Sequence, residues 1–536
     1  MNFLDSAEDK KRTFLKFMKF PPRAAAFYFK ESPKTVSEIL SDSEFSDYFE
    51  KTLEKLSRNS KGFPVYTNLW RGPEAESQGI AKKLGYSEFI ILSSDSEADF
   101  VSQVAERLPA SESGDPDWDE TSFFLFDGLA PLSDPKLISE LATRHDKYLA
   151  QYSYSENLPP GIVPRILSRE FVRSLPPGYA GGTQEFLAKN INHYDTEIFY
   201  SSPDLRQWRL DFSLKDTRSK MLVSSFLSRK SDWKYEEIQP FLSENPEVFR
   251  SAPSYYEIEV FRGCESECVF CPRQSLDPSQ DGITLEPAIL DSILNQAEEF
   301  GSDYSLCFGG LGEPTLHPKL DELIRRALQS THLKELFIES ALYASPEKLI
   351  QGILSVGEEE RKKISLIVNL TTRDKQTYTR LYGKDNLEKV LRHLEEVSRV
   401  LPKSSVYLQF LKIKDVDPEL DSWYEETQKA GYEVILQKYN SYADKLAQRR
   451  ASDLTPLGRD FCWHLSRDLY VNADGSVSVC KQIPASFSPA LGNLKTDSLK
   501  EIWKKGNPHF AASVRGQHDR IPAPCLNCDE WYTFNA

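Results

Sequence analysis

The sequence predicts an α/β protein with more than one domain, and three observations lead to this expectation. The chain has 536 residues, several times the roughly 150 residues of an average domain. From residue 255 to residue 439, strand-like alternation and helical periodicity follow one another repeatedly. The first 250 residues contain no cysteine, whereas the rest of the chain contains all eight, so the two parts differ in kind.

Composition narrows the class of protein further. A formal charge of -15 repels phosphate backbones and anionic lipid headgroups, while a hydrophobic share of 40% supplies several cores. The longest apolar runs, such as residues 24–29, are far shorter than the roughly 20 residues of a membrane span. The first residues, MNFLDSAEDKKRTF, lack the charge and apolar order of a secretory signal. We therefore expect a cytoplasmic protein with no membrane partner and no general nucleic-acid binding.

Residues 1–244 are expected to form an α/β domain. Within it, TSFFLFDGLAPLSDP (residues 121–135) combines a buried strand with an Asp-Gly turn, and a helix follows from about Lys136 to His145. Proline pairs at 159–160 and 176–177 impose extended or turn conformations. Residues 245–253 then indicate a linker or a capping segment.

Residues 254–445 are expected to form a parallel sheet with helices outside it, either open or curved into part of a barrel. Helix-like segments separate six strand-like segments, which are EIEVF, YSLCFGG, KELFIES, ISLIVNL, SVYLQFLKI and YEVILQKY. Five or six βα units result, and such sheets carry their functional groups at the C-terminal ends of the strands. The first cysteine group follows the first of these strands.

Cys264, Cys268 and Cys271 form the pattern C-x3-C-x2-C in FRGCESECVFCPRQ. Three thiolates on one loop suit three corners of a cubic iron-sulfur cluster, which leaves the fourth iron open for chemistry. A structural zinc site is the alternative, but it needs four ligands and no fourth Cys or His follows nearby.

This pattern, with Phe270 before the last cysteine, resembles the radical S-adenosylmethionine (radical SAM) superfamily. CFGGLGEPTLHP resembles the segment that holds the methionine part of SAM in that superfamily. The resemblance implies a [4Fe-4S] cluster, SAM bound at its open iron, and reductive cleavage of SAM to a 5′-deoxyadenosyl radical that abstracts hydrogen from a substrate. Binding roles are expected for Gly309, Gly310, Gly312, Glu313 and Pro314.

Two more residues carry expectations from the same resemblance. Phe270 is expected near the adenine of SAM, although packing alone also explains an apolar residue between two cysteines. Asn369, Leu370 and Thr371 stand where relatives often carry Ser-Leu-Asp near the ribose, so Asn369 is the candidate there. Cys307, on the strand before the glycines, is expected to be a core thiol.

The second cysteine group comprises Cys462, Cys480, Cys525 and Cys528, within residues 455–536. C-x12-G-x4-C followed by C-x2-C resembles the SPASM extension, which carries auxiliary clusters in radical SAM enzymes that modify peptides and proteins. Fuller versions of this extension contain more cysteines; four thiolates fit one fully ligated [4Fe-4S] cluster. A zinc site of four cysteines is the alternative. Residues 491–503 are expected to be an architectural turn and short helix.

Parts of the first domain resemble degenerate sugar-nucleotide cytidylyltransferases with a glycosyltransferase-A-like fold. In that family an aspartate at the position of Asp127 binds the metal, but Ser213 stands where the second metal aspartate belongs, and Asp211 and Asp216 are out of register. An Asp-Gly turn explains Asp127 equally well. The order of the three domains resembles the spiro-SPASM protein family.

The resulting expectation is a radical SAM enzyme that abstracts hydrogen from an unknown substrate, with a reducing donor such as flavodoxin or ferredoxin. The SPASM resemblance implies a peptide or protein substrate, whereas the nucleotidyltransferase resemblance implies a sugar. Two alternatives stay open at this point. One is a bifunctional enzyme with an active N-terminal nucleotidyltransferase; the other is a non-catalytic scaffold that binds iron-sulfur clusters and SAM.

Overall fold

The computed structural model describes residues 21–109, 121–275, 281–452, 461–483 and 490–532. The N-terminal residues discussed above, and part of the segment before Cys462, lie outside these ranges. The described chain divides into two compact units at Leu242 and Ser243. No helix within the described ranges combines the length and the apolar composition that crossing a membrane requires.

The first unit is a mainly parallel α/β sheet, as expected. Its described strands lie in the order β3-β2-β1-β4-β6-β5-β7, and β6 runs antiparallel to both of its neighbours. The strands are β1 (Pro22–Tyr28), β2 (Pro64–Thr67), β3 (Glu88–Ile91), β4 (Ser122–Asp127), β5 (Tyr152–Ser155), β6 (Arg165–Ser168) and β7 (Thr196–Phe199). The helices are α2 (Pro33–Ile39), α3 (Asp42–Ser57), α4 (Glu74–Leu84), α5 (Glu97–Arg107), α6 (Pro135–Lys147), α7 (Arg169–Arg173), α8 (Thr183–Asn190), α9 (Thr217–Leu227) and α10 (Ile238–Glu244).

Local sequence signals explain where the elements of this unit begin and end. β4 ends at Asp127 because Gly128 follows with a φ of 78°, a conformation that favours glycine. Helix α6 begins at Pro135, and the Asp134 side chain accepts hydrogen bonds from the next free backbone N–H groups. The expected strand, Asp-Gly turn and helix are therefore all present.

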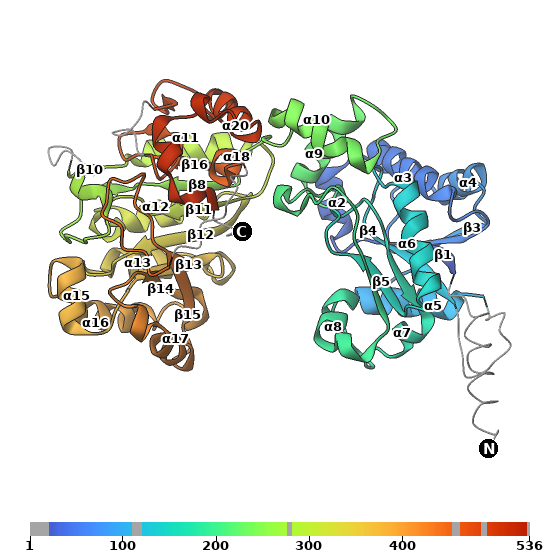
Figure 1. Ribbon diagram of the computed structural model, residues 1–536, viewed down its shortest axis with the longest axis horizontal. Coiled ribbons are helices and arrows are strands. Elements are labelled where there is room, and N and C mark those ends of the chain that lie inside the picture. Colours follow the sequence, from blue (N-terminus) through green and yellow to red (C-terminus); the bar gives the residue numbers. More distant parts are fainter. Residues whose placement is uncertain (1–20, 110–120, 276–280, 453–460, 484–489, 533–536) are drawn as a thin grey trace, which may run out of the picture. The chain divides into compact units, whose positions relative to one another are not determined.

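The second unit contains six parallel strands in sequence order, β8-β11-β12-β13-β14-β15 (Figure 1). They are β8 (Tyr255–Ile258), β11 (Tyr304–Phe308), β12 (Leu333–Ser340), β13 (Ile364–Asn369), β14 (Val406–Lys412) and β15 (Glu433–Lys438). The helices between them are α11 (Pro287–Glu298), α12 (Leu320–Ala327), α13 (Glu347–Leu354), α14 (Glu358–Arg361), α15 (Lys375–Tyr382), α16 (Leu387–Val397) and α17 (Leu420–Lys429). β15 pairs with β14 alone among the described strands, so the curved sheet is a partial barrel.

The helical periodicity of the sequence explains how these helices cover the sheet. In α16, Leu387, Val390, Leu394 and Val397 are buried and share one face, because residues three or four apart lie together on a helix. The strands contribute side chains such as Leu306, which is fully buried, to the same core. Helix and sheet therefore share one continuous apolar layer, which leaves the strand ends free to carry polar groups.

The C-terminal segment continues the barrel sheet instead of packing beside it. β16 (Asp468–Val471) pairs in parallel with β8, and β17 (Ser476–Ser478) and β18 (Gly492–Asn493) extend the sheet in antiparallel fashion. Helices α18 (Trp463–Arg467), α19 (Leu499–Lys505) and α20 (Asn507–Val514) complete this segment. Leu469, Val477 and Trp503 belong to the barrel core. The two short strands β9 (Phe261–Arg262) and β10 (Ile283–Thr284) form a separate hairpin-like pair.

Candidate active site

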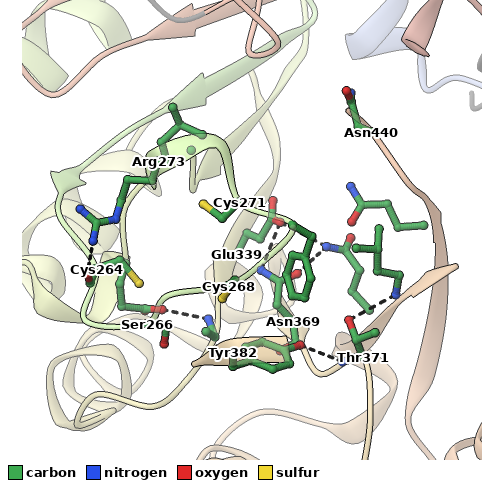
Figure 2. Close-up of a pocket in the computed structure, with 18 of the residues that line it drawn as sticks. Cys264, Ser266, Cys268, Cys271, Arg273, Glu339, Asn369, Thr371, Tyr382 and Asn440 are labelled. Carbon is green, nitrogen blue, oxygen red and sulfur yellow. Dashed lines mark hydrogen bonds between the residues drawn. The ribbon is translucent and has the colours of Figure 1, made fainter. Parts of the chain in front are cut away.

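A pocket lies where the parallel strands of the second unit end (Figure 2). Most of the residues that the sequence singled out for the first site line it, namely Cys264, Cys268, Phe270, Cys271, Gly310, Gly312, Glu313 and Asn369. Gly309 and Pro314 flank these lining residues; Pro314 is buried at the start of a short 3-10 helix. Segments that are about one hundred residues apart in the sequence thus meet at one place.

The cysteine loop is fastened by its backbone to neighbouring elements. Glu267 and Val269 donate their backbone N–H groups to the carbonyls of Tyr382 and Leu381 at the end of α15, at 3.0 and 2.9 Å. The Glu265 N–H donates to the Tyr343 hydroxyl at 2.8 Å. These bonds fix the backbone of the loop, and its three cysteines line the pocket.

Arg273 closes the same loop on its other side. Its guanidinium donates to the Cys264 carbonyl, as drawn in Figure 2, and pairs with Asp281 at 2.6 Å. The guanidinium also favours the charged form of the nearby Cys264 and Cys271 thiols. A cation next to three cysteines stabilises their thiolate form, which is the form that binds iron. The sequence analysis did not identify Arg273 for this role.

Burial opposes ionisation of the three thiols. It raises the pKa of Cys271 to about 11 and raises those of Cys264 and Cys268 as well. A positive metal centre among them would overcome this cost, because thiolates rather than thiols bind metals. No three Cys, His, Asp or Glu side chains in the described ranges could hold a metal ion between them. A cubic cluster presents a separate iron to each thiolate, so its ligands need not converge.

The glycine segment after β11 lets its backbone approach other chain segments closely. Gly310 has a φ of 89°, which favours glycine, and a Cβ there would lie 2.6 Å from the Tyr470 hydroxyl. A Cβ on Gly312 would lie only 1.7 Å from the carbonyl oxygen of Phe261. The segment therefore packs against the strand that leads into Cys264, and this cradle beside three soft thiol donors fits a cluster with a small ligand above it.

Glu313 anchors this segment to the end of β12. Its carboxylate is 2% exposed, and Oε1 accepts from the Thr315 N–H, the Thr315 hydroxyl and the Ser340 hydroxyl at 3.1, 2.6 and 2.6 Å. Oε2 accepts from the Ala341 N–H alone, at 2.9 Å. Burial raises the pKa of this carboxyl, and the hydrogen bonds oppose the rise. Oε2 is thus the oxygen that can still accept a hydrogen bond from a ligand ammonium.

Phe270 is both a lining residue and a packed one. Its ring lies edge-on to Tyr382 with the centroids 5.3 Å apart, and Tyr382 stacks on Tyr378 at 4.2 Å. The Tyr382 hydroxyl accepts from the Thr371 N–H and donates to the Asn369 carbonyl at 2.9 and 3.1 Å. The aromatic residues therefore connect the cysteine loop to the end of β13, where Asn369 lies.

The pocket also contains polar residues that the sequence analysis missed. The Asn369 side chain donates to Glu339 Oε1 at 3.3 Å, and Gln409 donates to Glu339 at 3.2 Å and to Asn369 at 2.5 Å (Figure 2). Glu339 is the next-to-last residue of β12, where a parallel sheet carries functional groups, whereas Gln409 lies in the middle of β14. These three side chains form a hydrogen-bonded layer across β12, β13 and β14.

The four C-terminal cysteines come together in a second place. Cys480 and Cys525 are buried in one small apolar cluster, against which Cys462 and Cys528 pack. Burial raises the pKa of Cys462 and of Cys480, and the neighbouring cysteines raise both further. All eight cysteines lie in the described ranges and are free thiols. Four neighbouring thiols that repel one another as thiolates suit a cubic iron-sulfur cluster, which offers a separate iron to each of them.

The candidate metal aspartates of the first unit are engaged by basic side chains, and no group of three potential ligands within the described residues could hold a metal ion. Asp127 pairs with the Arg165 guanidinium, whose side chain is 9% exposed and also pairs with Glu97 at 2.9 Å. Asp211 pairs with Lys215 and accepts from the Ser213 hydroxyl at 2.5 Å. Asp127 and Glu97 thus share the single charge of Arg165, and Asp211 is paired with Lys215.

Comparisons with known proteins agree with the two cysteine sites. The Radical SAM superfamily model matches residues 258–421, and the SPASM model, an iron-sulfur cluster-binding domain, matches residues 462–529. An uncharacterized protein of Treponema pallidum is 24% identical over 359 residues, which are 66% of this chain and 98% of that protein.

Two solved structures are similar at low identity. SuiB of Streptococcus suis, bound to the precursor peptide SuiA, has 14% identity and a TM-score of 0.40 over 65% of this chain and 83% of its own. A cytidylyltransferase of Leptospira borgpetersenii has 15% identity and a TM-score of 0.34 over 43% of this chain and 96% of its own. The two family matches cover both cysteine groups, and we conclude that this chain contains a radical SAM domain followed by a SPASM domain.

Proposed function

We propose that this protein is an enzyme that cleaves SAM reductively in order to abstract a hydrogen atom from a peptide or protein substrate. The observation that carries the proposal is the meeting of the three-cysteine loop and the glycine segment in one pocket. The match of residues 462–529 to an iron-sulfur domain supports a second cluster in the same chain. The choice of a peptide or protein rests on the SPASM resemblance.

The chain's own residues suit these cofactors. Cys264, Cys268 and Cys271 would hold the cluster, and Gly310, Gly312 and Glu313 would hold the methionine part of SAM. When bound, the cluster and SAM supply the electron and the cleavable sulfonium bond, and thereby the power to remove hydrogen from an unactivated carbon.

The residues around the cysteines position these groups rather than reacting themselves. Arg273 holds the loop closed at the Cys264 carbonyl, and the Tyr343 hydroxyl donates to the Cys264 sulfur at 3.4 Å. Phe270 supplies an aromatic ring suited to packing against adenine, and Tyr382 supports that ring edge-on. The thiols are partly buried and Glu313 is buried, which limits the access of water and protects a reactive radical from side reactions.

The C-terminal site is suited to electron transfer. All four of its candidate ligands are protein thiols, so a cubic cluster there would have no open iron for substrate. We assign it the role of accepting or relaying an electron, with a donor such as flavodoxin or ferredoxin supplying the first cluster. The first unit is assigned a binding or scaffolding role, because Asp127 and Asp211 are engaged in ion pairs with Arg165 and Lys215.

The test is reductive SAM cleavage under strict anaerobiosis. Wild-type protein with reconstituted clusters and dithionite should form 5′-deoxyadenosine, and the Cys264→Ala, Cys268→Ala, Cys271→Ala triple variant should form none. A matched control, Cys307→Ala, should retain cleavage because this thiol lies in the core and outside the pocket lining. Wild-type protein that binds its clusters but forms no 5′-deoxyadenosine would leave the non-catalytic scaffold as the better description.

A parallel assay addresses the first unit. Incubation with CTP, magnesium and sugar phosphates should give no pyrophosphate above background, and Asp127→Ala should not change that result. Pyrophosphate release that depends on Asp127 would instead support the bifunctional enzyme.

A further inference from the structure

The segment that follows β15 forms one wall of the pocket, opposite the cysteine loop. Lys438, Tyr439, Asn440 and Tyr442 all line the pocket, and Figure 2 shows Asn440 on the chain segment across from the cysteines. Tyr442 lies close enough to Cys271 that a charged thiolate there would raise the pKa of the phenol, in addition to the effect of burial. The wall therefore faces the space beside the expected SAM position, where a substrate has to lie.

This wall has an unusual backbone. Tyr442, Ala443 and Asp444 have φ values of 51°, 56° and 63°, which is the left-handed region that residues other than glycine rarely occupy. Three such residues in succession persist only where surrounding contacts hold them. The wall is thus a segment that its own sequence would not keep in this conformation.

The contacts that hold it come from Asp529 and Glu530. Asp529 is 4% exposed, its Oδ2 accepts from the Ser441 N–H at 2.5 Å, and its Oδ1 pairs with Arg450. The Asp529 backbone carbonyl accepts from the Lys438 ammonium at 2.5 Å. Glu530 Oε1 accepts from the Asn440 amide at 2.7 Å. Two consecutive residues therefore bind the wall at residues 438, 440 and 441, directly before its left-handed segment.

Asp529 and Glu530 directly follow Cys528, the last cysteine of the C-terminal site. The Glu530 N–H also donates to the Cys528 sulfur at 3.4 Å. Any change in the position of Cys528 is passed through one peptide bond to Asp529 and from there to the wall. The cysteine packs against the apolar cluster that contains Cys480 and Cys525.

We propose that Asp529 and Glu530 are positioning residues that hold the substrate-facing wall, residues 438–444, in place, and that loading of the C-terminal site sets the shape of this wall. That the wall faces a substrate rests on the proposed function. The physical link between the C-terminal site and the wall does not. It adds a structural role for the second cluster to the electron-transfer role.

Hydrogen–deuterium exchange of the reconstituted full chain tests this link without a known substrate. Asp529→Ala should speed exchange across residues 439–450 by about tenfold, because the Ser441 N–H loses its acceptor and the left-handed segment its support. Asp529→Asn should restore exchange to within about threefold of wild type, since an amide oxygen still accepts from Ser441. Asp497→Ala is the matched control, because Asp497 pairs with Lys505 in the same unit, away from the wall.

The decisive variant is the pair Cys525→Ala and Cys528→Ala, which removes the C-terminal cluster but none of the contacts to the wall. It should also speed exchange across residues 439–450 by about tenfold, while β12 stays within about threefold of wild type. Unchanged exchange in this variant, or in Asp529→Ala, would overturn the proposal. If Asp529→Ala also speeds exchange in β12, the Glu530→Ala variant is measured instead. We expect this variant to speed exchange in the wall and not in β12.

The same samples separate this proposal from the proposed function. Wild-type protein without 5′-deoxyadenosine formation would refute the enzymatic assignment, whereas the exchange result judges the link between Cys528 and the wall alone.

Discussion

Gly312 offers the sharpest test of how the glycine segment builds the SAM site. Gly312→Ala would place a methyl carbon 1.7 Å from the Phe261 carbonyl oxygen, and contacts under 3.0 Å do not occur. The segment would have to retreat by at least 1.3 Å, the difference between these two distances, because the obstacle is backbone. A misplacement of about 1 Å costs on the order of a hundredfold in rate at a site that depends on positioning.

We therefore expect Gly312→Ala to lower reductive SAM cleavage by about a hundredfold or more, while iron content stays at the wild-type level. The assay is 5′-deoxyadenosine formation by liquid chromatography and mass spectrometry, together with SAM affinity by equilibrium dialysis. Gly79→Ala is the matched control, because a Cβ there meets nothing within 4 Å on the exposed face of α4. That control should gain about 1 kcal/mol of stability from helix propensity and keep full cleavage.

Two outcomes would refute this reasoning. Gly312→Ala with cleavage and SAM affinity within about threefold of wild type would mean that the glycine segment does not position SAM. Loss of iron together with cleavage would mean that the substitution acts through the cysteine loop instead.

Three further predictions concern stability and metal content. Arg165→Met should destabilise the first unit by about 3 kcal/mol in urea unfolding, because two carboxylates lose a buried partner; Arg206→Met, at an exposed pair, should have a much smaller effect. Burial lowers the pKa of His145 to about 3, so the unfolded chain binds an additional proton below pH 6.5. Stability should therefore fall as the pH falls from about 6.5 towards 3, by up to about 1.4 kcal/mol per pH unit, and His145→Gln should remove this component of the slope. Cys480→Ala should remove about four irons per chain and leave 5′-deoxyadenosine formation in place; retained iron would place the second cluster elsewhere.

Periodicity in the sequence was sufficient to predict the partial barrel. The six strand-like segments between residues 255 and 439 correspond to β8 and β11–β15, because strands that contribute to an apolar core leave an apolar pattern in the sequence. Spacing was equally sufficient for the cysteines, since C-x3-C-x2-C keeps its three thiols on one loop whatever the rest of the chain does. The expectation that Cys307 is a core thiol agrees with its burial.

Long-range pairing could not be predicted. β16 joins the sheet beside β8 although more than two hundred residues separate them, and no local signal specifies such a partner. For this reason the C-terminal segment was expected as a domain of its own, whereas its described part shares the barrel's sheet and core. The boundaries at residues 254–445 and 455–536 stay predictions.

The chemistry of single side chains was predictable only where a motif marks it. Arg165 has no motif, yet it is buried and pairs with both Asp127 and Glu97. Gln409 was missed because it lies in the middle of β14, and Glu339 because its partners Asn369 and Gln409 come from other strands. The support of the pocket wall by Asp529 depends on a contact across 88 residues, which a linear pattern does not contain.

The most direct test of the central claim is the iron and sulfide content per chain after anaerobic reconstitution. Two cubic clusters predict about eight irons in the wild type and about four in the Cys264→Ala, Cys268→Ala, Cys271→Ala variant. About four irons in the wild type and none in the variant would show that the C-terminal site holds no cluster. Little or no iron in either protein would contradict the radical mechanism itself.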